Sequence, residues 1–167
     1  LEKLRNIDLE GFKSITIPSL FNVKQENDME TAMDTIFEAA DIAIENGYNI
    51  IILSDKGVDK DKAPIPALLV ASGLHHHLIR KGTRMKVSIV LESGEPREVH
   101  HFACLVGYGV NGINPYMAYE AIKELSDEKL LEYSYEDGVK RFNKACTKGI
   151  VKIMSKMGIS TIQSYQG

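Results

Sequence analysis

The chain has 167 residues and a formal net charge of −3, with 44% hydrophobic and 26% charged residues, a balance typical of one globular domain. No block of lysine and arginine marks a nucleic-acid-binding face, and no apolar run approaches the roughly 20 residues that cross a bilayer. We therefore expect neither nucleic acid nor a membrane among its partners.

The two ends and the two cysteines indicate the context of the chain. The sequence starts at Leu1 without a secretory signal and stops after an uncharged run over residues 161–167, so we expect a piece of a longer protein. Cys104 and Cys146 are too few and too far apart for a disulfide framework or a CxxC metal site. Isolated cysteines fit a reducing compartment, which predicts a cytoplasmic protein without a structural metal.

The first predicted elements alternate between strand and helix. Residues 14–20 are short and β-branched, and predict a strand. A helix capped by Asn27 or Asp28 follows and ends at Gly47. Its apolar residues recur at helical spacing, namely Met29, Met33, Ile36, Phe37, Ala40 and Ile44. Residues 49–55 form an apolar run that ends in polar residues, as parallel strands buried on both faces do.

The alternation continues through the second half of the chain. Pro64 and Pro66 stand where a helix can begin, and Gly82 stands where it ends. A third strand is predicted over residues 85–91, a helix from Glu95-Pro96 to about 106, a short strand over 110–113 and a helix from Asn114-Pro115. The pattern is then helical over 127–131 and 135–157, and residues 158–162 suit a strand or a connector.

Repeated βα units of this kind predict an α/β fold with a parallel sheet of about four strands and right-handed crossovers, followed by C-terminal helices. The sequence does not distinguish a half-barrel-like sheet from a small open one. We expect a single domain over residues 1–167. The βα units occupy about 14–125, the helical part 126–157, and the connector 158–167.

Two histidine runs invite a metal interpretation. Successive residues on a helix point about 100° apart, so the side chains of His75, His76 and His77 cannot all face one ion. We expect one buried, hydrogen-bonded imidazole and two near the surface. His100 and His101 receive the same interpretation, unless the two helices pack side by side and share a metal.

Polar residues follow the predicted strands at the edge where parallel sheets place their sites. A possible anion or small-ligand site there comprises Ser54, Asp55, Ser93, Gly94 and Asn114. The alternative is ordinary turn chemistry, because Glu92 and Glu95 would repel a phosphate. No catalytic triad or Walker loop is present, and the GxGxxG match at 107–112 leads into a strand instead of opening a helix. We therefore expect no catalytic, cofactor-binding or metal residue in this segment.

The last long helix carries a lysine at every fourth position from Lys144 to Lys156. These lysines form either a solvated basic face or a docking surface for an acidic neighbouring domain or an anionic ligand. In the second interpretation Lys148, Lys152 and Lys156 make the contact. We expect the residues beyond this helix to be mobile, because an apolar stripe without its partner has little to pack against.

Three long motifs carry a family resemblance. They are residues 65–80 (IPALL running into GLHHHLIR), 98–116 (EVHHFACLVGYG with INPY) and 148–161 (KGIVKIMSKMGIST). Together they closely resemble the large chain of glutamate synthase, in the carboxyl half of its central domain, and the resemblance covers about residues 15–167.

The resemblance implies an enzyme that makes two glutamates from glutamine and 2-oxoglutarate, with electrons from a pyridine nucleotide or ferredoxin. An amino-terminal cysteine hydrolyses glutamine, and ammonia moves inside the protein to a flavin barrel with FMN and an iron–sulfur cluster. Neither the nucleophilic cysteine nor the cluster cysteines match Cys104 or Cys146. The resemblance therefore implies a connecting domain between glutaminase and FMN domains, which is not catalytic in isolation.

Two alternatives belong to other classes. The first is an independent small-molecule or anion-binding βα module that uses the strand-end loops. The second is a degenerate enzyme of the flavin-barrel type, for which the purified protein would be yellow.

Overall fold

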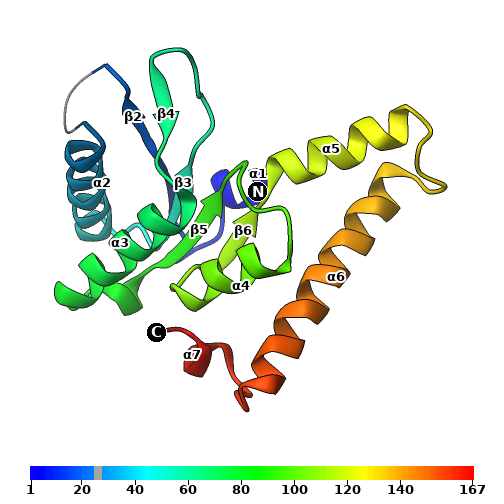
Figure 1. Cartoon of the computed structure of the whole chain (residues 1–167). Coiled ribbons are helices and arrows are strands. Elements are labelled where there is room, and N and C mark those ends of the chain that lie inside the picture. The colour runs from blue at the N-terminus through cyan, green and yellow to red at the C-terminus, as the bar shows by residue number, and fades with distance from the viewer. Residues whose placement is uncertain (25–27) are drawn as a thin grey trace.

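A computed structural model describes residues 1–24 and 28–167, and its centre is a four-stranded parallel sheet (Figure 1). The order of the strands in space is the order in the chain: β1 (Ser14–Pro18), β3 (Ile50–Ser54), β5 (Ser88–Glu92) and β6 (Gly112–Asn114). The predicted parallel α/β sheet is confirmed. β1 and β6 stand at opposite edges of the described sheet, so it is open and not a closed barrel.

The described chain has five helices of nine residues or more: α2 (Asp28–Glu45), α3 (Ala67–Arg80), α4 (Val99–Gly107), α5 (Tyr116–Asp127) and α6 (Tyr135–Lys156). Shorter segments are α1 (Glu2–Arg5), η1 (Arg84–Lys86) and α7 (Ile162–Tyr165). An antiparallel pair, β2 (Leu20–Asn22) with β4 (Lys62–Pro64), projects beyond the sheet and was not predicted. Within the described ranges no helix is long and apolar enough to span a bilayer.

The two faces of the sheet are covered differently. Alternate residues of the strands, such as Ile51 and Leu91, pack with α2, α3 and α4 into one continuous core. The other face carries Ile50, Ile52 and Val90, and the apolar residues packed there come from the amino-terminal segment. The helices of the main core therefore lie on one face of an open sheet whose strands follow the order of the chain.

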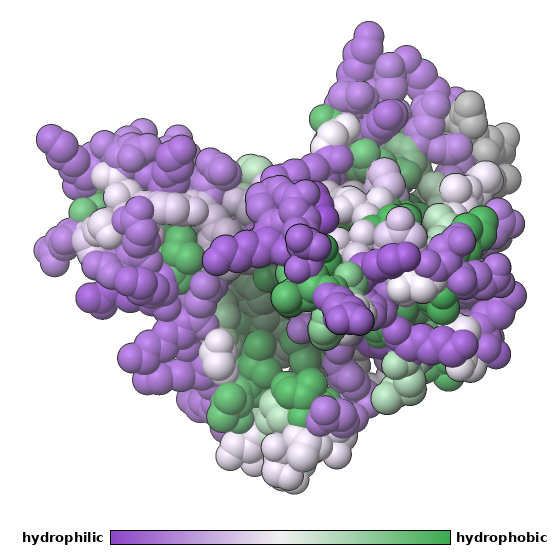
Figure 2. Space-filling view, turned by 180° about the vertical axis from the view of Figure 1, so that it is seen from behind, coloured by the Kyte–Doolittle hydropathy of each residue, from purple (hydrophilic) through white to green (hydrophobic). Residues whose placement is uncertain are grey.

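The face opposite the helices is seen from behind in Figure 2. A hydrophilic cluster stands at the centre, where Figure 1 places α1, and apolar surface is hollowed beneath it. A groove in this region is lined by residues of the amino-terminal segment and the sheet, among them Leu4, Ile50, Val90 and Gly112. The short α1 is therefore the cap of a face that a doubly wound fold would cover with helices.

Several element boundaries differ from the prediction. The third strand starts at Ser88 because residues 84–86 form a 3-10 turn, and α4 starts at Val99 instead of Glu95. The fourth strand covers 112–114. The helix predicted over 127–131 does not form, since α5 ends at Asp127 and Lys129 adopts a φ of 57°.

Of the two residues predicted as alternative caps at the start of α2, the structure describes only Asp28. Asn27 lies outside the described residues. Asp28 is the first residue of the helix, and its carboxylate accepts the backbone N–H of Asn22. At the other end Gly47 has the predicted left-handed φ, 80°.

The carboxyl-terminal segment is packed, in contrast to the expected mobility. The Tyr165 hydroxyl donates to the carbonyl of Ala103 at 3.1 Å, and the N–H of Gly167 donates to the carbonyl of Gly107 at 3.0 Å. The sequence pattern missed these contacts because the partners lie about 60 residues away, on α4.

α6 packs against α4 and α5 through small residues. A Cβ at Gly149 would lie 2.4 Å from Cγ1 of Val99, and a Cβ at Gly138 would lie 2.6 Å from Cγ2 of Ile122. Both distances are shorter than van der Waals contact, so glycine is required for this approach of the helices.

The contact between Gly149 and Val99 predicts that the effect of a substitution at Gly149 depends on the residue at position 99. In the native background, we expect Gly149→Ala to reduce the free energy of unfolding, because the overlap with the stiff Val99 side chain outweighs the gain in helix propensity. In a Val99→Ala background both γ-carbon overlaps are removed and only the Cβ of residue 99 remains close, at 3.1 Å, so the same change should cost much less, or add up to about 1 kcal/mol through helix propensity.

Urea unfolding of the four proteins of this cycle measures the coupling between the two positions. Equal effects of Gly149→Ala in both backgrounds would contradict the close packing of α4 on α6.

Candidate functional site at the carboxyl edge of the sheet

The five residues predicted as a strand-end site lie together at the carboxyl edge. The parallel register aligns Ser54 with Glu92, and Glu92 with Asn114. Asp55 and Ser93 follow directly on their strands, and both are buried. This proximity follows from the sequence, because the carboxyl ends of parallel strands meet at one edge.

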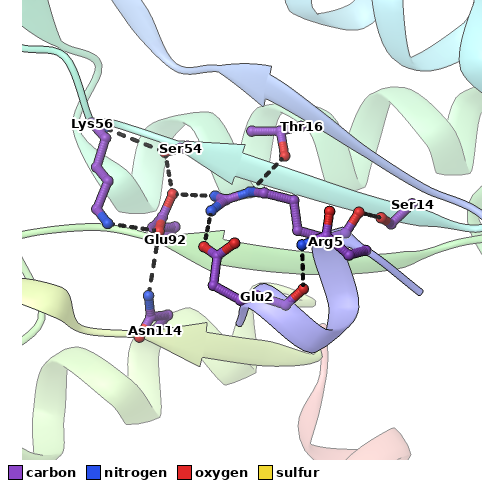
Figure 3. Close-up of polar contacts among 9 residues, drawn as sticks. Glu2, Arg5, Ser14, Thr16, Ser54, Lys56, Glu92 and Asn114 are labelled. Carbon is purple, nitrogen blue, oxygen red and sulfur yellow. Dashed lines mark hydrogen bonds and ion pairs between the residues drawn. The ribbon is translucent and has the colours of Figure 1, made fainter. Parts of the chain in front are cut away.

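Glu92 is the centre of this edge (Figure 3). Its side chain is only 1% exposed. One carboxylate oxygen accepts from the Ser54 hydroxyl at 2.6 Å and from the Arg5 guanidinium at 2.7 Å. The other lies 3.2 Å from Nζ of Lys56 and 3.4 Å from Nδ2 of Asn114. Both oxygens are thus paired, with four donors from three separate segments of the chain.

Arg5 connects this carboxylate to the amino-terminal cap. Its Nε donates to the Thr16 hydroxyl at 3.3 Å, and its Nη1 lies 2.6 Å from the Glu2 carboxylate (Figure 3). The cap is therefore attached to β1 and β5 through one guanidinium. The sequence signal was weak, since an arginine in the first turn of a short helix has no periodic pattern that points to residue 92.

The pKa shifts of Glu92 and Arg5 both favour the charged forms of these two side chains. Burial tends to raise the pKa of Glu92, but hydrogen bonds from Ser54, Arg5 and Lys56 outweigh burial and lower it. Burial also tends to lower the pKa of Arg5, while its bonds with Glu92 and Glu2 raise it. Glu92 is therefore a charged, structurally paired carboxylate at neutral pH.

Asp55 is the second buried carboxylate of the edge. It accepts from the Ser93 hydroxyl at 2.6 Å and from the N–H of Gly94 at 3.1 Å. Burial, followed by a hydrogen bond with Asp55 and the nearby charges of Asp55 and Glu92, raises the pKa of Tyr116 to about 12. The Lys56 ammonium lies 5.1 Å from the centre of the Tyr116 ring. Tyr116 and Lys56 were not predicted as members of this site.

The loop after β5 is held in place by its own polar groups. The Ser93 hydroxyl accepts the N–H of Glu95 at 3.1 Å, and the Glu95 carboxylate accepts the N–H of Ala67 at 3.0 Å. The second bond places a negative charge at the first turn of α3, where the helix dipole favours it. The loop after β5 is therefore attached to the start of α3 by a hydrogen bond.

These bonds determine what the predicted anion site can do. The hydroxyls of Ser54 and Ser93 and the N–H of Gly94 all point to carboxylates. An incoming phosphate would have to displace Asp55 or Glu92 and to sit beside their charges, which costs free energy at both steps. The geometry supports turn and cap chemistry better than anion binding.

His75 is the buried imidazole of the first histidine run, and His76 is exposed, as predicted. Arg84 Nε donates to His75 Nδ1 at 2.9 Å. Because Nδ1 accepts, Nε2 carries the proton and donates to the main-chain oxygen of Gly167 at 2.9 Å. Burial is the main cause of the lowered pKa of His75, with smaller contributions from the charges of Arg84 and His76.

The remaining histidines make pairs with carboxylates. His77 lies 3.0 Å from Asp41 and stacks on Phe37. His100 and His101 are exposed and lie within 3.6 Å of Glu98. Among residues 1–24 and 28–167, no group of three or more His, Cys, Asp or Glu side chains could hold a metal ion.

The residues present do not fit the FMN or the iron–sulfur cluster that the resemblance implies for an intact enzyme. A cluster needs about four cysteine ligands, whereas Cys104 is exposed and Cys146 is buried on another helix. A flavin phosphate needs free N–H donors, and the donor of Gly94 is already bonded to Asp55. No chemical step is therefore assigned to either group in this chain.

The lysines predicted as a docking surface lie on α6. Lys148, Lys152 and Lys156 are all exposed. Lys148 also lines a groove with Lys144 and Arg141. None of the three predicted lysines has an ion-pair partner within the described part of the chain.

Comparison with known proteins identifies a shared domain. The family model described as glutamate synthase central domain matches residues 1–167. The glutamate synthase [NADPH] large chain of Bacillus subtilis is 50% identical over 168 residues, which cover 98% of this chain and 11% of the relative. Glutamate synthase [NADH] of Schizosaccharomyces pombe is 37% identical, covering 99% of this chain and 8% of the relative.

A third relative is the chloroplastic ferredoxin-dependent glutamate synthase of Spinacia oleracea, 37% identical over 100% of this chain and 11% of its own length. The chain thus spans about one tenth of the length of the relatives it matches. The names of these relatives state different electron donors, so the similarity over this segment does not depend on which donor a relative uses.

Glu92 generates a prediction about stability and pH. We expect Glu92→Gln to lower the free energy of unfolding at pH 7 by about 1–3 kcal/mol, because two cations lose a charged partner. The folded pKa of Glu92 is lowered from its ordinary value of 4.5. Its stabilisation is therefore complete above about that pH and is lost as the pH falls through the lower folded pKa.

The difference between the two proteins in urea unfolding should accordingly shrink in acid. Glu10→Gln, at an exposed residue without an ion pair in the described ranges, is the control and should change little. A constant difference from pH 7 to well below the ordinary value would contradict a charged, paired Glu92.

The contact between Gly109 and His75 generates a second prediction. Gly109 has a φ of 89°, and a Cβ there would lie 2.0 Å from His75 Nδ1. Gly82 has a similar φ, 70°, but nothing lies within 4 Å of its Cβ position. Gly82→Ala should cost about 1 kcal/mol from backbone strain alone, and Gly109→Ala should cost roughly 1–3 kcal/mol more from overlap.

Thermal or urea unfolding measures both costs, and NMR of the His75 imidazole reports whether the ring moves. Equal losses in the two variants would show that the ring is not seated against Gly109.

Proposed function

Because this chain belongs to the glutamate synthase central domain family, we propose that it is a connecting scaffold of a glutamate synthase and does not catalyse in isolation. In this proposal the parent enzyme makes two glutamates from glutamine and 2-oxoglutarate. The adjacent glutaminase and FMN domains of the parent chain carry the chemistry. FMN and the iron–sulfur cluster are bound outside this segment, in the FMN domain. The parent enzyme is cytoplasmic. The scaffold fixes the path of ammonia between the two sites.

The observation that carries the proposal is the state of the strand-end polar groups. Both buried carboxylates, Asp55 and Glu92, are satisfied by donors of the same chain. A catalytic or binding edge needs groups that are free to meet a substrate. An edge whose donors and acceptors are consumed internally serves rigidity instead, because buried paired networks hold one arrangement. The same pairing argues against an anion-binding module or a flavin-barrel enzyme.

The carboxyl-terminal segment supports a role in spacing. Residues 158–167 are the proposed connector to the FMN domain. Three bonds, from His75, Tyr165 and the N–H of Gly167, hold this connector against α3 and α4. A connector held by bonds to the domain fixes the direction in which the chain continues, which a free linker would not.

The test uses the intact parent enzyme with Tyr165→Ala. This change removes the hydroxyl bond to Ala103 and the ring packed 3.5 Å from the Cβ position of Gly107. We expect the glutamate formed per glutamine hydrolysed to fall several-fold, while glutaminase activity and ammonia-dependent glutamate synthesis each stay near the native rate. Tyr108→Ala, at a 44% exposed tyrosine, is the matched control.

Two results would contradict the scaffold proposal. One is a Tyr165→Ala enzyme that forms as much glutamate per glutamine hydrolysed as the native enzyme. The other is a purified 167-residue chain that is yellow with bound flavin, which would favour the flavin-barrel alternative.

A further inference from the structure

α2 and α6 carry charges of opposite sign at opposite sides of the molecule (Figure 1). α2 contains six acidic residues and no lysine, arginine or histidine. α6 contains six lysine or arginine residues and two acidic ones, both in its first turn. The net charge of −3 therefore conceals a strongly bipolar domain.

The charges on α2 form one stripe. Since each helical residue advances by about 100°, the acidic residues of the stripe fall within about 80° of arc and along about 22 Å of axis. They are Glu30, Asp34, Glu38, Asp41 and Glu45. Asp41 pairs with His77 and Lys81. The other four are exposed and have no ion-pair partner in the described part of the chain.

The charges on α6 form a stripe of similar length. Lysines recur at every fourth residue from Lys140 to Lys156, along about 24 Å of axis. Lys140 has a partner on its own helix, Asp137. The four lysines after it are exposed, and no ion pair satisfies them within residues 1–24 and 28–167.

Each stripe has an exposed aliphatic residue beside or within it. Ile42, 58% exposed, flanks the acidic stripe, and Val151, also 58% exposed, lies within the lysine stripe. An apolar contact at the centre with charges around it is the common composition of a helix–helix interface. The stripes are thus similar in length and opposite in sign, and each has an exposed aliphatic residue beside or within it.

We propose that the lysine stripe of α6 docks on the acidic stripe of α2 of a second copy of this chain. The contact is heterologous, because each copy presents one stripe of each sign, so association either closes into a ring or continues as an open chain. It is weak and salt-dependent, because exposed ion pairs contribute little and are screened. The scaffold proposal does not depend on it.

Sedimentation equilibrium of the 167-residue chain tests the contact. At about 0.01 M ionic strength, where charges act over about 30 Å, the average mass should rise with concentration above 18.6 kDa. At about 1 M, where the range is about 3 Å, it should return to 18.6 kDa.

Charge reversal identifies the surfaces. The α6 variant carries Lys144→Glu, Lys148→Glu and Lys152→Glu, and the α2 variant carries Asp34→Lys, Glu38→Lys and Glu45→Lys. Each alone should remain at 18.6 kDa at low salt. Mixed together they should associate, because the reversed α6 stripe of one variant is complementary to the reversed α2 stripe of the other, and the two native stripes remain complementary as well. Recovery of association in the mixture also shows that both variants are folded.

A control with the same change in net charge alters exposed lysines elsewhere, Lys3→Glu, Lys60→Glu and Lys123→Glu, and should associate like the native chain. A native chain that stays monomeric at low salt would overturn the proposal and leave a neighbouring domain as the occupant of the lysine stripe. The proposal would also be overturned if the control variant lost association as fully as the α6 variant, or if the mixture of the α2 and α6 variants did not associate.

Discussion

A carboxylate buried to 99% must be neutralised or paired, and the pairing of Glu92 determines much of this structure. Its partners come from β3, from the loop after β3, from β6 and from the amino-terminal helix. The last partner, Arg5, explains why a helix of four residues can cover a sheet face. The charge pair supplies an attachment that so short an apolar surface could not.

The same pairing decides how the carboxyl edge can be used. In α/β proteins this edge ordinarily exposes hydroxyls, carboxylates and N–H groups to a ligand. Here Asp55 and Glu92 take up the donors of Ser54, Ser93 and Gly94. The edge therefore stiffens the domain, which suits the proposed role of a scaffold in a segment that spans about one tenth of its relatives' length.

The order of strands and helices could be predicted because hydrophobic period and Gly or Pro punctuation are local signals, as in the fully buried β3 and the left-handed Gly47. The proximity of Ser54, Ser93 and Asn114 followed from parallel topology. The roles of Arg5, Lys56 and Tyr165 could not be predicted, since each depends on a partner distant in sequence or on another element. The helix predicted over 127–131 failed because local propensity lost to the turn at Lys129.

The most direct test of this account is an NMR titration that follows the side-chain carboxyl carbon of Glu92 and the backbone amides of residues 2–7 together. The account predicts that Glu92 titrates below its ordinary value of 4.5, and that hydrogen exchange of the α1 amides accelerates over the same pH range. A Glu92 that titrates at or above 4.5, or α1 amides whose protection does not follow it, would contradict the claim that this carboxylate holds the cap on the sheet.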